Sequence, residues 1–204
     1  MSALIRKPAF NDLRRRYALS LILPQSQELF SSFKTPGFFS PHILPNLRMS
    51  RIEYRTTDIN EINLIRPLWI RLNDYMLGKA GKFRSHYEQM TFDERKAYFE
   101  KVAAAGSLHL DLAFDPQTGG KYVGCCVSSL SQEKTGEIES VFVEEEFRSR
   151  DIGSALVIRA LAWFDEKGSV RNRVAAGAGN EGVANFYKKF GFYPRMMVLE
   201  QKRE

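Results

Sequence analysis

The segment GEIESVFVEEEFRSRDIGSA, residues 136–155, combines the patterns of a strand, a basic turn and the start of a helix. Polar and apolar side chains alternate over residues 137–143, which predicts a β-strand. One face of this strand would carry Ile138, Ser140 and Phe142, and the other face Glu139, Val141 and Val143. After three glutamates the chain would enter the turn and then a helix.

The turn, Arg148-Ser-Arg-Asp-Ile-Gly-Ser154, favours the binding of a phosphate group. The first N–H groups of a helix have no partner within the helix, and the helix dipole favours negative charge beside them. Arg148 and Arg150 add positive charge and can each hold an anion with two hydrogen bonds. We therefore expect a ligand that carries a pyrophosphate at this turn.

The composition is typical of one globular domain. Hydrophobic residues make up 44% of the 204 residues and charged residues 26%, and no apolar run approaches the roughly 18 residues of a membrane span. Seven of the 30 Lys and Arg residues, but only two of the 24 Asp and Glu residues, lie in residues 1–48. The net charge of +6 is therefore concentrated there, and we expect neither nucleic acid nor a membrane as a partner of the rest.

The cysteines and histidines indicate neither disulfides nor a metal site. Cys125 and Cys126 are adjacent in a strand-like run, where they would be small buried hydrophobic residues of a reducing compartment. The three histidines show no metal-binding spacing. We expect a cytoplasmic protein without a metal.

Residues 1–48 differ from the remainder in being basic and containing five prolines. They could be an organelle-targeting leader, a tail that binds a partner, or a stretch that precedes a true start at Met49. We favour the start at Met49, because a strand pattern begins immediately after it. The expected organisation is a poorly ordered or non-native extension, 1–48, followed by one domain, 49–204.

From Met49 onward the patterns predict an α/β fold with a central mixed, mostly antiparallel sheet flanked by helices. Two segments have the capping-box spacing that begins a helix, Asp58-x-x-Glu61 and Thr91-x-x-Glu94. A meander of three strands would cover 107–143, and a last strand 192–199. The expected order is β-αα-βββ-α-β-α-β.

This order and two motifs resemble the GNAT-type N-acetyltransferases, which use acetyl-CoA. The family's pyrophosphate signature, Arg or Gln, two residues, Gly, one residue, then Gly or Ala, is similar to the segment from Arg148 to Gly153. A second family pattern is matched by Asn180, Ala184, Phe186-Tyr187 and Gly191-Phe192. One departure is Asp151, which stands where the family usually has its first glycine.

The resemblance implies transfer of an acetyl group from acetyl-CoA, the co-substrate, to a primary amine by direct attack in a ternary complex. It implies that Tyr187 is the acid for the departing thiolate, while Glu139 is the nearest candidate for the base. The residues expected to bind acetyl-CoA are Val141, Phe142, Val143, Arg148, Ser149, Arg150, Asp151, Ile152, Gly153, Ser154 and Asn180. A groove for the amine would be lined by Trp69, Tyr75 and His86.

Several alternatives stay open at this point. The acceptor could be a small-molecule amine or a peptide amine, and the domain could instead be a non-catalytic acyl-CoA-binding module. Asp151 makes the module plausible, because its carboxylate could cap the helix and occupy the N–H groups that a pyrophosphate needs. Met196 and Met197 in the last strand could join a partner subunit and form a homodimer.

Overall fold

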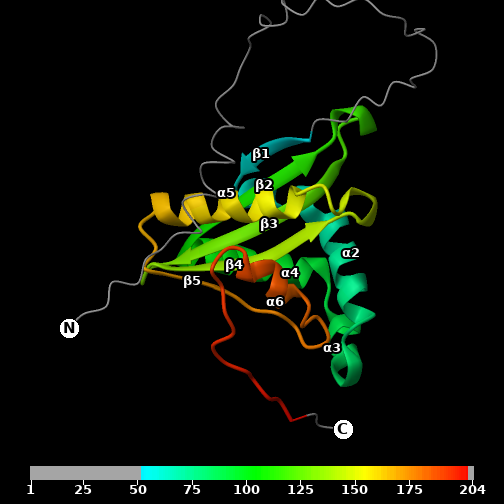
Figure 1. The fold of residues 1–204 in the computed structure, drawn as a ribbon, viewed down its shortest axis with the longest axis vertical. Helices are drawn as coiled ribbons and strands as arrows, with labels where there is room; N and C mark the ends of the chain where they lie inside the picture. Colours follow the sequence, from blue (N-terminus) through cyan, green and yellow to red (C-terminus); the bar gives the residue numbers. More distant parts are fainter. Residues whose placement is uncertain (1–51, 202–204) are drawn as a thin grey trace, which may run out of the picture. The chain divides into compact units, whose positions relative to one another are not determined.

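The computed structural model describes residues 52–201, which form a five-stranded sheet with helices on both faces (Figure 1). The sheet order is β1-β2-β3-β4-β5. The first four strands pair antiparallel, and β5 pairs parallel to β4. This confirms the predicted mixed, mostly antiparallel sheet. The strands are β1 (Glu53–Thr57), β2 (Gly106–Phe114), β3 (Tyr122–Ser131), β4 (Thr135–Val143) and β5 (Arg171–Val174).

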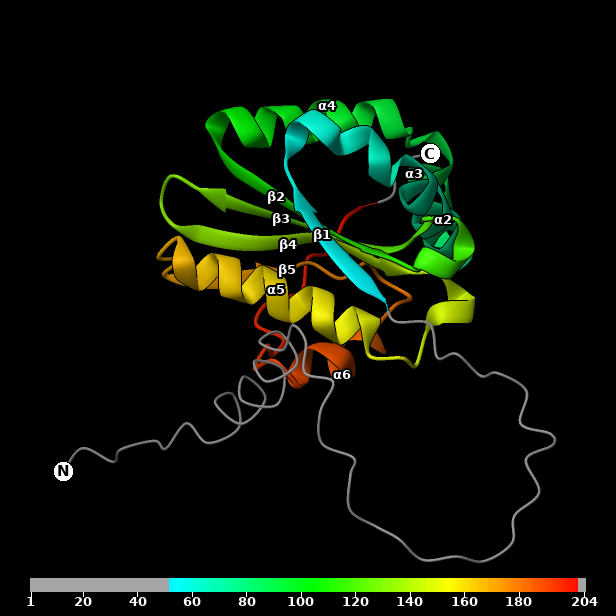
Figure 2. The ribbon, with the colours of Figure 1, turned by 90° about the horizontal axis from the view of Figure 1, so that it is seen from above.

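The helices divide between the two faces of the sheet, with α4 on one side and α5 and α6 on the other (Figure 2). We call these the α4 face and the α5 face. Short 3₁₀ turns lie at Gly81–Phe83 (η2), Pro116–Thr118 (η3) and Glu145–Phe147 (η4). The longer helical segments are η1 (Ile59–Ile65), α2 (Arg66–Leu77), α3 (Arg84–Gln89), α4 (Phe92–Ala105), α5 (Ile152–Glu166) and α6 (Val183–Lys188).

Each face of the sheet has its own hydrophobic core. On the α4 face, Phe99 and Leu110 are fully buried with residues of η1 and α2. On the α5 face, Leu156 and Phe164 are fully buried, and Tyr187 of α6 packs into the same cluster. Burying one large side chain contributes about 1.5–3 kcal/mol, so both faces need their helices for stability.

Strand β4 contains a β-bulge that changes which side chains share a face. Ser140 lies opposite Val127, whereas Ile138 lies opposite Ser128, so Glu139 is an extra residue on β4. Ile138 therefore packs in the α5-face core with Val141, while Phe142 packs in the α4-face core. The predicted common face for Ile138, Ser140 and Phe142 is wrong, because one inserted residue shifts the two-residue alternation.

One of the two predicted capping boxes forms. Thr91 accepts from the backbone N–H of Glu94, and the Glu94 carboxylate accepts from the backbone N–H of Thr91 at 2.9 Å. Asp58 caps η1 by accepting from the backbone N–H of Asn60. The Glu61 carboxylate binds Arg55 and does not accept from the backbone N–H of Asp58, as a capping box requires. A 3₁₀ segment therefore precedes α2 where a continuous helix was expected.

The C-terminal part of the described chain does not form the predicted last strand. Residues 192–201 have no strand or helix, and they extend away from the sheet in Figure 1. Their apolar side chains are exposed, including Tyr193 and Met196, at 73% and 83%. A segment with alternating apolar residues forms a β-strand only when its backbone pairs with the edge of a sheet. No described strand pairs with this segment.

The expectations for residues 1–48 lie outside the described residues. Within residues 52–201, no helix is long and apolar enough to cross a membrane. The same residues contain no group of three or more His, Cys, Asp or Glu side chains placed to hold a metal ion.

Candidate functional site

The basic turn between β4 and α5 adopts two left-handed backbone conformations in close succession. Ser149 has φ 59° and Asp151 has φ 57°. Each such residue with a Cβ atom costs roughly 1–2 kcal/mol, and Asp tolerates the conformation better than most residues. The predicted turn therefore forms without the family's first glycine, and α5 begins immediately after it at Ile152.

The Asp151 carboxylate does not cap α5. Asp151 occupies the N-cap position, but its side chain accepts no capping hydrogen bond. Its backbone carbonyl instead accepts from Ala155 at 2.9 Å. The expected competition between this carboxylate and a phosphate for the N–H groups of Gly153 and Ser154 is therefore wrong. The negative charge of Asp151 nevertheless stays beside the first turn of the helix.

Beyond the bulge, β4 presents a free backbone edge next to this turn. Pairing of β4 with β5 ends where Ile138 meets Val174. Glu144 donates its backbone N–H to the Val123 carbonyl on β3. In an antiparallel pair, successive residues direct their N–H and C=O groups alternately toward and away from the neighbouring strand. The N–H and C=O groups of Val141 and Val143 therefore point away from β3. No described residue pairs with Val141 on that side. This edge can accept an extended, amide-bearing ligand arm.

The Arg148 side chain contacts both β4 and α2. Its Nε donates to the Val143 carbonyl at 3.0 Å, and its guanidinium lies 5.2 Å from the ring centroid of Tyr75. Arg71 of α2 forms an ion pair with Glu144 just before the turn. Tyr75, predicted to line an amine groove, thus lies beside the basic turn. Arg150 donates to the Glu146 carbonyl and lies over the Phe147 ring.

Tyr187 lies on the α5 face in the cluster that contains Val141 and Val143. The residue is 6% exposed, and its ring packs edge-on against Phe186 and Phe192. Burial, with a smaller contribution from Cys126, raises the pKa of the Tyr187 phenol. A tyrosine phenol is protonated at neutral pH even at its ordinary pKa of about 10, and the raised pKa extends that protonated range to higher pH.

Glu139 lies on the opposite side of the sheet, where α4 holds its carboxylate. Ser129 donates to Oε1 at 2.8 Å, Arg95 to Oε2 at 3.2 Å and Tyr98 at 3.3 Å. Arg95 also donates to the Glu139 carbonyl at 3.2 Å. The sequence reasoning missed Arg95 and Ser129 as neighbours of Glu139. The helical i, i+3 spacing of Arg95 and Tyr98 was the available signal for a shared face.

Asn180 does not cap α6. The N-cap residue is Gly182, and no side chain caps this helix. Asn180 instead donates its backbone N–H to Gly177 and accepts from Val183. Next to it, Gly179 has φ 84°, and a Cβ atom there would lie 2.1 Å from the Lys79 carbonyl oxygen. The loop between β5 and α6 therefore lies directly against the end of α2.

The predicted amine groove does not include Trp69. Its side chain is 6% exposed, packs edge-on against Phe92 in the α4-face core and lines neither of the two cavities described below. His86 is exposed on α3, with its ring against Tyr87. The structure does not bring Trp69, Tyr75 and His86 together around one cavity.

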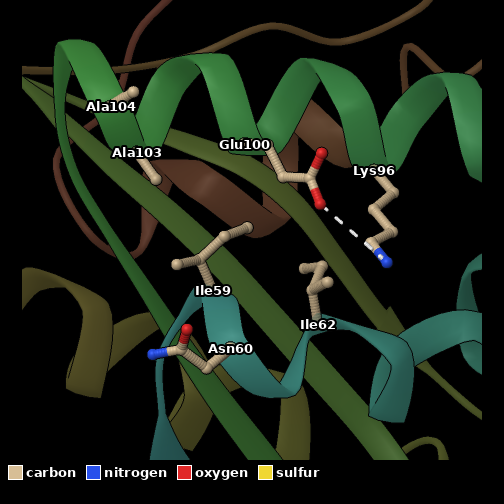
Figure 3. Close-up of a pocket in the computed structure, with 7 residues that line it drawn as sticks. All are labelled: Ile59, Asn60, Ile62, Lys96, Glu100, Ala103 and Ala104. Atoms are coloured by element: carbon tan, nitrogen blue, oxygen red, sulfur yellow. Dashed lines mark ion pairs between the residues drawn. The ribbon is translucent and has the colours of Figure 1, made fainter.

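Two cavities lie on the α4 side of the sheet. One, of about 530 Å³, is bounded by η1 and α4 and contains none of the predicted site residues. Figure 3 shows that Ile59 and Ile62 point toward the helix, where Lys96 and Glu100 form an ion pair of 3.9 Å. The other, of about 370 Å³, lies between the end of α4 and strands β3, β4 and β5, and Glu139 lines it.

Solved structures with this fold include several acetyltransferases. One is a putative acetyl transferase from Pyrococcus furiosus, 22% identical over 74% of this chain and 100% of that chain, with a TM-score of 0.56. Another is a GCN5-related N-acetyltransferase from Ralstonia eutropha, 23% identical over 74% and 99%, with a TM-score of 0.59. An aminoglycoside N-acetyltransferase in complex with CoA is 18% identical over 77% and 97%, with a TM-score of 0.56. At these identities the likeness concerns the fold.

Two curated relatives are also N-acetyltransferases by name, both uncharacterized. The relative from Methanocaldococcus jannaschii is 32% identical over 88 residues, which are 40% of this chain and 39% of that protein. The relative from Chlorobaculum tepidum is 38% identical over 73 residues, 36% and 44% of the two proteins. The chain thus spans less than half the length of either relative.

The acetyltransferase (GNAT) family matches residues 76–192, which include β4, the basic turn, α5 and Tyr187. This match extends over more than half of the 204 residues, and the protein therefore belongs to the acetyltransferase (GNAT) family.

Proposed function

We propose that this protein transfers the acetyl group of acetyl-CoA to a primary amine by direct attack in a ternary complex. The observation that carries this is the backbone edge of β4 beyond the bulge, where no described residue pairs with Val141 on the side away from β3. This edge leads past Val143, whose carbonyl accepts from Arg148, to the uncapped start of α5. The edge suits the amide-bearing arm of CoA, and the first N–H groups of α5 suit its pyrophosphate. Family membership supports the same co-substrate.

Acetyl-CoA would supply an activated acyl group with a thiolate as leaving group. Tyr187 and Glu139 lie on opposite faces of the sheet at the segment where β4 and β5 part. Tyr187, a phenol that is protonated at neutral pH, would give a proton to the departing sulfur. Glu139 would take a proton from the attacking amine through water, and the hydrogen bonds from Ser129 and Arg95 hold its carboxylate in position.

The proposed function is tested by two measurements on the full chain. Calorimetric titration gives the affinity for acetyl-CoA, and thiol release with a panel of amines and peptides gives turnover. We expect binding and amine-dependent thiol release. Binding without release for any amine would indicate an acyl-CoA-binding module, and absence of binding would contradict the proposal.

Replacing Asp151 by Gly should strengthen acetyl-CoA binding about fivefold. A like charge about 5 Å from a phosphate costs roughly 1 kcal/mol in a solvated setting, and Gly also adopts the observed φ of 57° without strain. Titration calorimetry measures the change in affinity.

Asp151→Asn is the matched variant for this test, because Asn removes the charge and keeps tolerance for the left-handed conformation. Equal gains for Asn and Gly would assign the effect to charge, and a gain for Gly alone would assign it to the backbone. Unchanged or weaker binding by Asp151→Gly would contradict the expected repulsion.

A further inference from the structure

The 370 Å³ cavity beside Glu139 contains side chains of both charges. It lies on the α4 face, and Glu139 lines it at the bulge, where the pairing of β4 with β5 ends. Its charged lining residues are Glu133, Glu137, Glu139, Arg171 and Arg173. An amine that occupied this cavity could reach the Glu139 carboxylate, the candidate base.

Most of these charges are paired within the protein. Glu137 forms an ion pair with Arg173 at 2.6 Å, and Glu139 forms one with Arg95 at 3.2 Å. Within residues 52–201, Glu133 and Arg171 form no ion pair. In the described part of the chain, the Arg171 guanidinium donates to the Thr135 hydroxyl at 3.3 Å, and the Glu133 carboxylate accepts from Ser131 and its own backbone. One positive and one negative group are therefore left for a ligand.

These two unpaired groups lie at the end of the cavity away from Glu139. Arg171 pairs in register with Thr135, the first residue of β4, and Glu133 lies in the turn just before it. Thr135 and Glu139 are four residues apart, about 13 Å along a strand. Arg171 and Glu139 both line the cavity, so a ligand bound at Arg171 would extend along β4 toward Glu139.

We propose that the acceptor is a free diamino acid of the lysine or ornithine type, an assignment that rests on the proposed function. Arg171 binds its α-carboxylate, Glu133 binds its α-ammonium, and its side-chain amine lies at Glu139. The amine nitrogen forms a bond to the acetyl carbon as the carbon–sulfur bond breaks. Glu139 receives the amine proton through water and Tyr187 protonates the sulfur, which gives an ω-N-acetyl amino acid and free CoA.

The two unpaired groups argue against other amines in this cavity. A diamine without a carboxylate offers no anion to Arg171, so the guanidinium would lose solvent without gaining a partner. A lysine within a peptide has its α-amine and α-carboxyl groups in neutral amides, so it matches neither Arg171 nor Glu133. The zwitterionic head group of a free amino acid matches both.

The test compares kcat/KM for L-lysine with that for 1,5-diaminopentane and for lysine blocked at both α-groups. We expect kcat/KM for L-lysine or L-ornithine to exceed that for the diamine of the same chain length by at least about tenfold. This factor corresponds to one charge-assisted hydrogen bond. Arg171→Gln should reduce the ratio of lysine to diaminopentane roughly tenfold, and Arg171→Lys should restore part of it. Lys134→Gln, which removes a nearby exposed cation outside the cavity lining, should keep the wild-type ratio.

The outcomes separate this assignment from the proposed function. Absence of acetyl-CoA binding, or of thiol release with every amine, would contradict the proposed function itself. Thiol release with diamines or blocked lysine at rates equal to those with lysine, unaltered by Arg171→Gln, would overturn only the diamino acid. Titration of the product, N-ε-acetyl-lysine, gives a readout without turnover, and its affinity should fall about tenfold in Arg171→Gln.

Discussion

Tyr187→Phe should lower kcat for acetyl transfer by roughly 100-fold while leaving the fold intact. A positioned proton donor contributes typically 10²–10⁴-fold, and Phe keeps the ring that packs against Phe186 and Phe192. The rate of thiol release at saturating acetyl-CoA and amine measures the effect, and thermal unfolding verifies the fold. KM for acetyl-CoA should change little, because the phenol acts on the sulfur as it departs.

Tyr193→Phe is the matched control for this substitution. It removes the same hydroxyl group from a side chain that is 73% exposed and lies outside the proposed site. Its kcat should equal that of the unmodified protein. Full turnover by Tyr187→Phe would remove Tyr187 from the mechanism and leave it as a core aromatic residue.

Asp111→Asn should reduce the free energy of unfolding by about 3 kcal/mol, and the melting temperature by roughly 8 °C. The Asp111 carboxylate is 1% exposed beneath α5, where it accepts from Arg159 at 2.8 Å and from Thr56 at 2.7 Å. It also contacts His109 at 3.0 Å, whose ring stacks on Trp163. Removing the negative charge leaves the Arg159 guanidinium without its partner. Chemical denaturation measures the difference.

The pH dependence of this difference follows from the pKa of Asp111. Burial by itself raises the pKa of this carboxyl, but the His109 hydrogen bond and the charge of Arg159, with Thr56, hold it below its usual value. A carboxyl whose folded pKa is lowered stabilises the protein above its unfolded pKa, about 3.9, and this contribution is lost as the pH falls further. The stability difference between the two proteins should therefore be complete at neutral pH and shrink below about pH 4.

Asp93→Asn serves as the control for Asp111→Asn. Asp93 pairs with Arg66 at 2.5 Å, but its side chain is 74% exposed, and exposed pairs contribute at most about 1 kcal/mol. The melting temperature of the Asp93→Asn protein should stay within a few degrees of that of the unmodified protein. Equal losses for the two substitutions would contradict the role given to burial.

The sequence predicted those parts of the structure that depend on local patterns. The residues Arg148–Gly153 predicted the basic turn. The second motif, around Tyr187, indicated the acetyltransferase family to which the protein belongs. The Thr91 capping box also follows from short-range spacing. The turn and the capping box are each fixed by residues within a few positions of one another, and the class of the sheet follows from the order of strand and helix patterns along the chain.

The features that the sequence did not predict depend on distant partners. The bulge at Glu139 arises from pairing with β3, and an extra residue leaves the apparent alternation of β4 unchanged. Residues 192–199 have the alternation of a strand but pair with no described strand, so they do not form one. Trp69 has the spacing of a helix face, but only the tertiary fold decides that Phe92 covers it. Arg95 reaches Glu139 across 44 residues of sequence.

The bulge in β4 has a consequence for how this strand can vary in evolution. The inserted Glu139 shifts the alternation of side chains by one position. Ile138 and Val141 therefore share a face although they are an odd number of positions, three, apart. Substitutions of similar size leave that offset intact. Deleting one residue would cancel the offset and exchange the faces of every side chain on one side of the gap. The length of β4 is therefore under stricter constraint than its composition.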